Sequence, residues 1–462
     1  MRTELSSVSG HTARVVPVPI TGAPTGEGPV TWGQWAIRAA MLDMEPDDHG
    51  TNIRVLHPIA PAVAPKTALT AVRGLLSVYD SLRTRIVIGD DKTMRQHLDS
   101  EGTHDVCVFE AEDADAADAL ARQIEKQWHA VSFAYDREWP IRTALIQVDG
   151  RIVHAVMVLS HIASDALGLS LVHRTFAALL DGADPAVLRK DSPGFQPLAE
   201  AAYQASEKGR KRDEAARRHW RQALRDCPER LFERREGAAP EFRQAVLASP
   251  PLPAALEVLS DRWQVPSSAI LLAAASTVMA RQSGSDRCVL QVMVSNRFLP
   301  HLRETVSPIT LEGLFIVDVG EDGFEAVARR AARSAMKTYY HAYYDKAVLN
   351  EDLRKDAGER GAGADLTCWY NDLRDMTART RTTDVREHQA GRVTESFIEW
   401  GERLGAQSQT SLAWHMYSSA HLMPLTLTVD TSLIDEAATE AMLYGFESLI
   451  VDAAAATTAV TP

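Results

Sequence analysis

The segment from residue 141 to residue 180 constrains the fold more than any other part of the chain. Two apolar runs, 141–148 and 151–159, are separated by Asp149-Gly150. An Asp-Gly pair between apolar runs is a strong signal for a tight turn between antiparallel strands. A short loop follows, and residues 165–180 then have the apolar spacing of a helix. The segment therefore predicts a β-hairpin that leads directly into a helix, which is typical of a mixed α/β chain.

Strands and helices are mixed in this way on both sides of residue 190. Residues 1–28 are rich in Ser, Thr, Gly and Pro without periodicity, and we interpret them as a loose N-terminal tail. Gly, Pro and Asp cluster between 181 and 197, which is the best position for a domain boundary. We therefore expect two α/β lobes of related design, an N-terminal lobe at 29–190 and a C-terminal lobe at 191–462.

The charge balance and the apolar runs limit the partners of the chain. Its 462 residues include 62 acidic and 49 basic side chains, a formal net charge of −13. Affinity for nucleic acid comes from clustered Lys and Arg, so we expect no nucleic-acid partner. The longest nearly apolar run, 269–280, is shorter than the roughly 20 residues that span a bilayer. Four scattered cysteines without a Cys-x-x-Cys pair indicate neither a disulfide framework nor a zinc site. We expect a cytoplasmic protein without a metal, a cofactor of its own or a membrane partner.

The loop after the second hairpin strand contains the strongest candidate for chemistry. His161 follows the apolar strand, and Asp165 lies four residues later at the start of the helix. A side chain at such a junction can be rigid and accessible, and a neutral imidazole accepts a proton near physiological pH. A packed core histidine is the alternative. The spacing alone cannot decide, because His341 and Asp345 repeat it inside an apparent amphipathic helix.

Several segments of the chain resemble the motifs of one family, and they occur in the same order as in that family. Ser160-His-Ile-Ala-Ser-Asp-Ala166 is similar to the His-His-x-x-x-Asp-Gly signature of condensation domains of nonribosomal peptide synthetases. Leu82, Arg83 and Thr84 match the family's motif Arg-His-Glu-x-Leu-Arg-Thr-x-Phe, with Asp80 in place of the Glu. The other similar segments are Thr31-Trp-Gly-Gln34, His219-Trp-Arg-Gln-Ala-Leu224, 295–306, Gly313-Leu-Phe-Ile-Val-Asp318 and 425–450. The resemblance spans about 32–450.

The resemblance implies two chloramphenicol-acetyltransferase-like lobes that form a V-shaped pseudo-dimer around a central channel. It also implies that His161 abstracts a proton from, or orients, an attacking amine or hydroxyl. Asp165 would be structural and would pair with an arginine from the other lobe, for which Arg297 is our candidate. Two signature positions differ from the family, because Ser160 replaces the first His and Ala166 replaces the Gly. The second His, which the family ties to catalysis, is present as His161.

These features predict a free-standing acyltransferase of the condensation type that acts in specialised metabolism, such as antibiotic biosynthesis. It would join an acyl or aminoacyl thioester, held on the phosphopantetheine arm of a separate carrier protein, to an amine. Backbone N–H groups at the start of the helix would polarise the thioester oxygen. An ester-forming alcohol acyltransferase on the same fold is one alternative. A catalytically silent module that recruits a partner is the other, and Ser160 and Ala166 are compatible with it.

One charged segment adds a further hypothesis. We interpret it as the solvated face of a helix, and the sharper alternative is a docking surface for an acidic carrier protein. Its basic residues are Lys208, Arg210, Lys211, Arg212, Arg217, Arg218, Arg221 and Arg225.

Overall fold

The predicted hairpin lies at the centre of the first sheet in the computed structural model. Strands β9 (Ile141–Val148) and β10 (Arg151–Leu159) pair antiparallel, with Val156 opposite Ala144. Asp149 and Gly150 have φ values of 49° and 72°, which is the left-handed pair that a type I′ turn requires. The structure describes residues 5–191, 194–235, 239–320, 322–360, 365–374, 394–405, 410–419 and 422–458.

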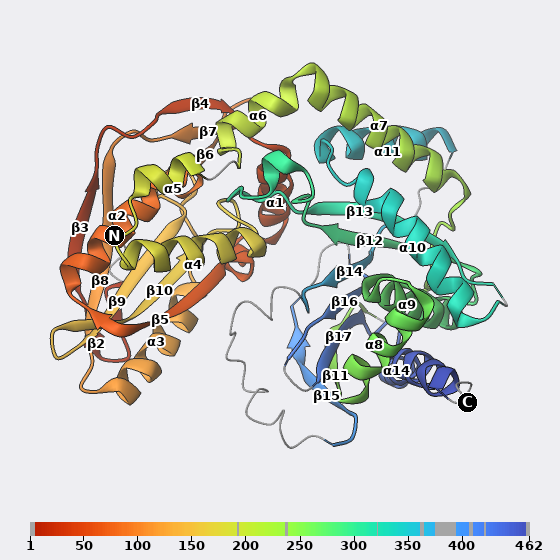
Figure 1. The fold of residues 1–462 in the computed structure, drawn as a ribbon. Coiled ribbons are helices and arrows are strands. Elements are labelled where there is room, and N and C mark those ends of the chain that lie inside the picture. Colours follow the sequence, from red (N-terminus) through yellow and green to blue (C-terminus); the bar gives the residue numbers. More distant parts are fainter. Residues whose placement is uncertain are drawn as a thin grey trace. The chain divides into compact units, whose positions relative to one another are not determined.

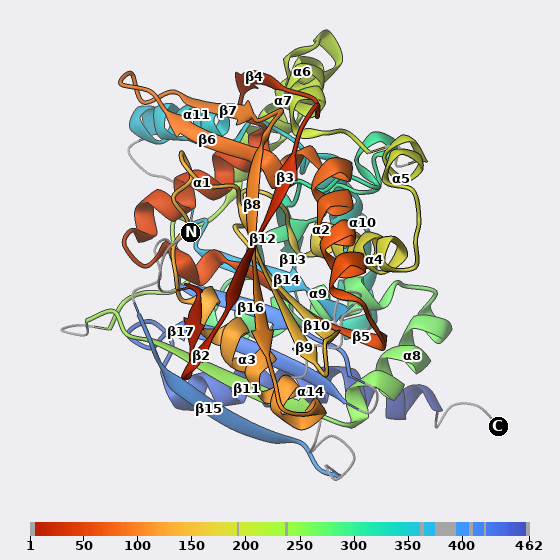
Figure 2. The ribbon, with the colours of Figure 1, turned by 90° about the vertical axis from the view of Figure 1, so that its left-hand side faces the viewer.

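This first sheet has five strands in the order β3-β8-β9-β10-β5 (Figure 1), and Figure 2 views it from its β3 edge. The outer strands are β3 (Arg14–Ile20), β8 (Gly102–Glu110) and β5 (Ile53–Val63). Alternate side chains of β10 enter two different cores. Ala155, Met157 and Leu159 pack with α2 (Pro65–Val78) and α4 (Ala166–Leu180), and Val156 and Val158 pack with α3 (Ala114–His129). Both faces of the sheet are therefore covered by helices, and β10 is held firmly where it enters the following turn.

The prediction of a loose tail at residues 1–28 is wrong. Strands β1 (Ser7–Val8), β2 (His11–Thr12), β3 and β4 (Gly26–Pro29) lie there, and β3 pairs antiparallel with β8. Val18 and Ile20 are buried, whereas Pro17 and Pro19, which alternate with them, are exposed. Proline lacks an N–H group and is tolerated on an edge strand, where no second neighbour needs that donor. The prolines of this segment therefore belong to an edge strand and not to a loose tail.

Residues 26–98 also form a three-stranded sheet in the order β4-β7-β6, with β7 (Met94–Leu98) and β6 (Thr84–Ile88). Two sequence motifs lie close to this sheet, one at the start of α1 (Trp32–Met44) and one just before β6. Thr31 caps α1 in a capping box with Gln34. Arg83 is fully buried and donates to Asp80 at 2.8 Å, and Arg189 donates twice to the same carboxylate. Both sequence motifs of this region are therefore structural.

The chain divides into two compact units at positions that differ from our prediction. The first unit comprises Met1–Lys211 together with Ser295–Thr310, and the second comprises Arg212–Val294 and Leu311–Pro462. The boundary lies beyond residue 190 because α6 (Pro197–Ala205) belongs to the first unit. There the side chain of Gln204 accepts a hydrogen bond from the Trp32 amide at 3.0 Å.

The segment 295–310 is far from the first unit in sequence but is packed tightly within it. The Phe195 amide donates to the His301 carbonyl oxygen at 3.0 Å. A Cβ atom at Gly33 would lie 1.4 Å from the carbonyl oxygen of Pro308. Only glycine allows α1 to approach the segment so closely.

The second unit contains a seven-stranded sheet in the order β13-β12-β14-β16-β17-β11-β15 (Figure 1). Its apolar core includes residues of α8 (Pro251–Trp263), α9 (Ser267–Ser283), α10 (Phe324–Tyr340) and α14 (Glu436–Thr458). Every residue from 269 to 280 is buried, so the longest apolar run of the sequence is a core helix. The strands are β13 (Leu311–Asp318), β12 (Arg287–Val294), β14 (Cys368–Asp372), β16 (Leu412–Met416), β17 (Met423–Asp430), β11 (Phe242–Ser249) and β15 (Phe397–Leu404).

Two further helices are discussed below, α7 (Glu207–Ala223), which belongs to this unit from Arg212 on, and α11 (Lys346–Arg360). Across the described ranges, no single helix is long and apolar enough to cross a membrane. The bent pair α8 and α9, with an angle of 108° between them, meets that test by length and composition only.

Candidate functional site

The turn between β10 and α4 places His161 at the end of a rigid strand. Ser160 is fully buried, its amide donates to the Pro140 carbonyl oxygen at 3.0 Å, and its own carbonyl accepts from the Ala163 amide at 3.0 Å. These bonds close the turn that follows the strand. Ser160 therefore faces inward as part of the backbone frame, and His161 is the partly exposed residue next to it.

The imidazole of His161 is enclosed on one edge. Its Nδ1 atom is buried, and it has no hydrogen-bond partner within the part of the chain that the structure describes. His161 as a residue is partly exposed, so Nε2 is the ring nitrogen that we assign to a substrate. Burial lowers the pKa of His161 below its ordinary value, although its own backbone, the Asp165 carboxylate and the Ser164 backbone favour the protonated form. The ring is consequently neutral at physiological pH and can accept a proton.

Asp165 is the most densely bonded carboxylate of the site. Its Oδ1 atom caps α4 by accepting from the Gly168 amide at 2.8 Å. Arg297 donates to both carboxylate oxygens, with Nη2 2.7 Å from Oδ1 and Nη1 2.8 Å from Oδ2. Thr310 adds its hydroxyl at 2.7 Å and its amide at 3.1 Å, both to Oδ2. Burial alone would raise the pKa of Asp165, but the Arg297 charge and these hydrogen bonds lower it, so the carboxylate is ionised.

The structure thus brings together Asp165 and Arg297, as the resemblance implied. The prediction that this arginine comes from the other lobe is wrong for the units that the structure shows. Arg297 is encoded beyond the predicted boundary, but the segment that carries it belongs to the same compact unit as Asp165. Its Nη2 atom also donates to the Thr305 carbonyl oxygen at 3.0 Å, which fixes the guanidinium within that segment.

Sequence analysis did not find two residues of this cluster, Thr310 and Gly168. Thr310 lies 145 positions from Asp165 and belongs to no motif that we recognised. Gly168 is in the first turn of α4, where a Cβ atom would be 2.2 Å from Ser164 Oγ and 3.3 Å from Arg297 Nη2. A glycine within a helix costs stability. Its presence in α4 was therefore a sequence signal that close packing requires a glycine at this position.

The start of α4 also offers backbone donors. Asp165 caps the Gly168 amide, and the N–H groups of Ala166 and Leu167 have no acceptor among the described residues. Ala166 is partly exposed, and its Cβ atom therefore does not disrupt the packing of the site. N–H groups in the first turn of a helix attract negative charge.

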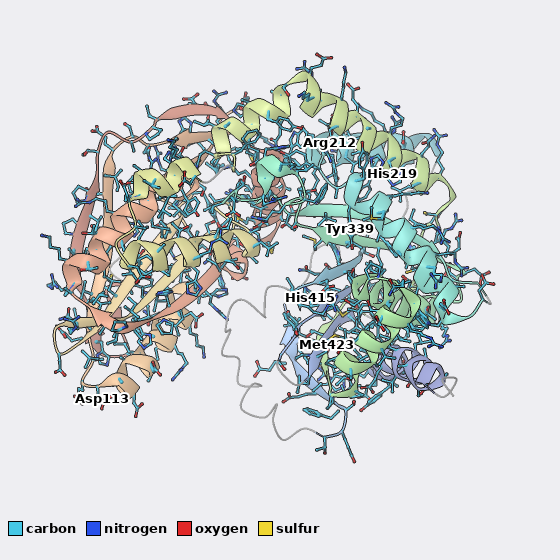
Figure 3. All side chains as sticks on the ribbon, viewed as in Figure 1. Asp113, Arg212, His219, Tyr339, His415 and Met423 are labelled. Carbon is cyan, nitrogen blue, oxygen red and sulfur yellow. The ribbon has the colours of Figure 1, made fainter. Side chains whose placement is uncertain are left out.

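Two other histidines, His154 and His341, and the cysteine Cys368 do not belong to this cluster. His154 Nε2 lies 2.6 Å from Asp118 Oδ1, so this residue is packed against α3. His341 follows α10 in the second unit and stacks on His219 of α7, with ring centroids 4.4 Å apart; Figure 3 labels His219. Cys368 is buried, and burial raises the pKa of its thiol well above its ordinary value, so it is a core residue. In the described ranges, no group of three or more His, Cys, Asp or Glu side chains could hold a metal ion.

Comparison with known protein families identifies the fold. The family model described as the condensation domain matches residues 33–381 of the chain. This chain belongs to the condensation-domain family. No curated protein sequence matches it.

Solved structures agree with this assignment of the condensation domain. A condensation domain of the enacyloxin polyketide synthase, described as mediating chain release, superposes with a TM-score of 0.70 at 15% identity and covers 95% of this chain and 84% of its own. SgcC5 from Streptomyces globisporus has a TM-score of 0.66 at 13% identity, with 93% and 99% covered. The epimerization domain of tyrocidine synthetase module TycB3 has a TM-score of 0.68 at 11% identity, with 95% and 99% covered. At these identities the likeness establishes the mixed α/β fold of the condensation domain. Two of these relatives are described with different roles, chain release and epimerization.

Proposed function

We propose that this condensation domain transfers an acyl or aminoacyl group from a carrier-protein thioester to an amine. The observation that carries the proposal is the position of His161. It lies in the turn between β10 and α4, partly exposed, with Nδ1 enclosed, four residues before a carboxylate that is fully engaged by Arg297 and Thr310. Asp165 cannot act as a proton acceptor while it holds these bonds, so the imidazole is the available base.

The reaction needs one base and one group that stabilises an oxyanion. The amine nitrogen would attack the thioester carbon while His161 Nε2 accepts or orients the amine proton. The oxygen of the tetrahedral intermediate would gain stabilisation from the amides at the start of α4. The C–S bond then breaks, and the thiolate takes the proton from the imidazolium. One amide and one thiol are formed from one amine and one thioester, so positioning and proton transfer are sufficient.

The partners follow from this chemistry. The donor would be presented on the phosphopantetheine arm of a carrier protein, and the domain would need no cofactor of its own. The central channel implied by the resemblance and the cytoplasmic location expected from the sequence stay predictions. An alcohol acceptor, which would give an ester, needs the same base and the same oxyanion donors, so the choice of acceptor must be measured.

The product decides between the alternatives. We expect the purified chain, supplied with acyl carrier proteins and acyl-pantetheine thioesters of different chain lengths, to give an amide by mass spectrometry when amines are offered. Products from alcohols alone would replace the proposal with an ester-forming transferase. Carrier binding without any product, across donors and both acceptor classes, would favour a silent recruiting module.

The lowered pKa of His161 predicts the pH dependence of catalysis. The base must be neutral, and a pKa below the ordinary 6.5 keeps it neutral to lower pH. We therefore expect kcat/KM, calculated on the concentration of unprotonated amine, to stay constant as the pH falls to 6.5 and to decline only at lower pH. The measurement is kcat/KM across pH, with circular dichroism at each pH to confirm that the fold persists. An acid limb centred at or above the ordinary histidine value would contradict a buried, neutral imidazole.

A further inference from the structure

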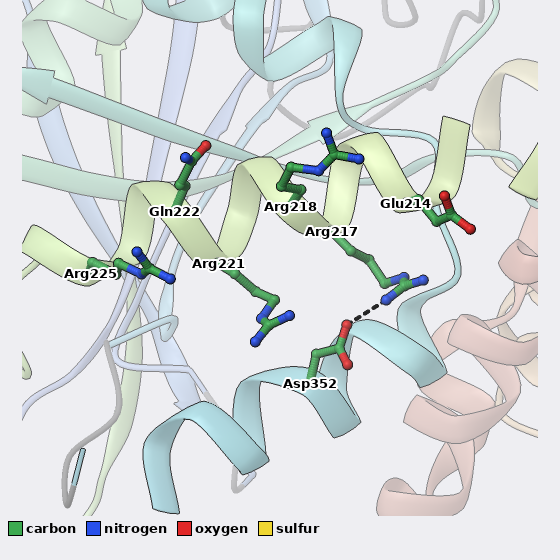
Figure 4. Close-up of a pocket in the computed structure, with 7 residues that line it drawn as sticks. All are labelled: Glu214, Arg217, Arg218, Arg221, Gln222, Arg225 and Asp352. Carbon is green, nitrogen blue, oxygen red and sulfur yellow. Dashed lines mark hydrogen bonds and ion pairs between the residues drawn. The ribbon is translucent and has the colours of Figure 1, made fainter. Parts of the chain in front are cut away.

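One flank of α7 concentrates positive charge in an otherwise acidic protein. Between Glu207 and Arg225 the sequence has eight basic and three acidic side chains, a net charge of +5, whereas the whole chain has −13. Four of these arginines line a pocket of about 340 Å³ that also includes Asp352 of α11 (Figure 4). We call Arg217, Arg218, Arg221 and Arg225 the arginine flank.

Two members of the arginine flank are held in place by acidic residues of the same unit. Arg217 contacts Asp213 at 2.9 Å and Asp352 at 2.5 Å. Arg221 makes two hydrogen bonds to Asp356, at 2.7 and 2.6 Å. Figure 4 shows both guanidinium groups directed towards α11. These pairs fix the floor of the pocket, and they neutralise the charge there.

The other two members of the arginine flank keep their charge available. Arg218 and Arg225 are exposed, and neither forms an ion pair with any described residue. Arg218 lies in α7, and Arg225 lies seven residues further along, in the 3₁₀ turn Leu224–Asp226 that directly follows α7. The two residues are therefore about 10 Å apart along the helix axis. Arg221, between them in sequence, is still 43% exposed. The result is two exposed cations, Arg218 and Arg225, with the paired but partly exposed Arg221 between them in sequence.

The shape and chemistry of this surface indicate the class of ligand. Pockets for small molecules are mostly apolar and enclosed, whereas this one is lined by charged side chains that are largely exposed. A single phosphate would need donors that converge on one point, but these guanidinium groups are spread along the helix. Carboxylates repeated along a partner helix match this spacing, and opposite charge accelerates and orients protein association.

We propose that the arginine flank of α7 is a docking surface for an acidic helix of a partner protein. The partner helix would lie along α7, with carboxylates about seven residues apart opposite Arg218 and Arg225. Arg217 and Arg221, held by Asp352 and Asp356, would keep the floor of the surface rigid. The proposal concerns binding only and does not depend on the reaction proposed above.

Fluorescence anisotropy with a labelled, alanine-rich helical peptide tests the proposal. The probe carries glutamates about seven residues apart, and a matched peptide carries glutamine at those positions. For the double variant R218E/R225E we expect affinity for the glutamate peptide to fall by at least about tenfold, and R218Q/R225Q should lose less. Binding to the unchanged protein should weaken as salt is raised. The control R14E/R137E makes the same change in net charge at two exposed arginines of the first unit, and it should bind as tightly as the unchanged protein.

Several results would overturn the docking surface. If R218E/R225E and the control lose the same affinity for the glutamate peptide, the effect comes from net charge alone. Equal binding of the glutamine peptide would remove the role of carboxylates. Tighter binding of tripolyphosphate or of a single-stranded oligonucleotide than of the glutamate peptide would assign the flank to phosphate ligands. Circular dichroism spectra and Tm values that match the unchanged protein confirm that the variants are folded.

Discussion

Replacing His161 with alanine should lower kcat/KM for acyl transfer by about two to four orders of magnitude, the range associated with the loss of a positioned general base. His161 is partly exposed and its Nδ1 has no partner among the described residues, so we expect its removal to cost the fold little. The loss should therefore appear in catalysis and leave the free energy of unfolding nearly unchanged. Steady-state kinetics with an acyl-pantetheine donor, together with urea unfolding, measure both quantities.

The variant His11→Ala is the matched control, because His11 is an exposed residue of the separate β1–β2 hairpin. It should retain full activity. If His161→Ala keeps its activity, the imidazole is not the base. A variant in which kcat is preserved and only KM rises would instead indicate that His161 orients the acceptor.

Replacing Arg297 with alanine should lower the free energy of unfolding by about 3–5 kcal/mol, because it leaves the buried Asp165 carboxylate without its counter-charge. The two side chains are only 11% and 3% exposed, so solvent screens their interaction little. Arg297→Lys keeps the charge but loses the bidentate geometry. Its free energy of unfolding should lie between those of the unchanged protein and Arg297→Ala. Urea unfolding of Arg297→Ala, Asp165→Ala and the double variant measures the coupling. The double variant should lose less than the sum of the single variants.

The pH dependence of stability gives an independent check on this pair. The pKa of Asp165 is lowered in the folded protein, so its contribution is present above the unfolded value of 3.8 and is lost as the pH falls through the folded pKa. The difference in stability between the unchanged protein and Arg297→Ala should therefore be largest near neutral pH and should shrink in acid. A difference that does not vary with pH would show that Arg297 acts through packing alone.

Local patterns predicted the hairpin and α4 closely, because an Asp-Gly turn and a helical period depend on neighbouring residues only. The errors arose where distant packing decides the structure. Pro17 and Pro19 suggested a loop, but the edge position of β3 makes them compatible with a strand. The predicted boundary near 190 followed a Gly- and Pro-rich stretch, and contacts such as that of Gln204 with Trp32 keep α6 in the first unit.

The site shows the same division. His161 follows a strand and Asp165 begins a helix, and both positions can be predicted locally. The pairing of Asp165 with Arg297 required the resemblance to a family, because 132 positions separate the two residues. Thr310 has no local signature, and only the coordinates show that it contributes two donors to the same oxygen. A carboxylate that is buried in this way needs more donors than one arginine supplies.

The path of the chain through the first unit has a consequence for biosynthesis. Asp165 can pair with Arg297 and Thr310 only after these residues leave the ribosome, and residues 212–294 are synthesised before them. The first unit is thus begun early and completed late, and strands β12 and β13, on either side of the returning segment, are part of the other unit. Neither unit can be cut out of the polypeptide as one continuous stretch. A graft or an exchange between relatives must therefore carry 295–310 along with the N-terminal portion that it completes.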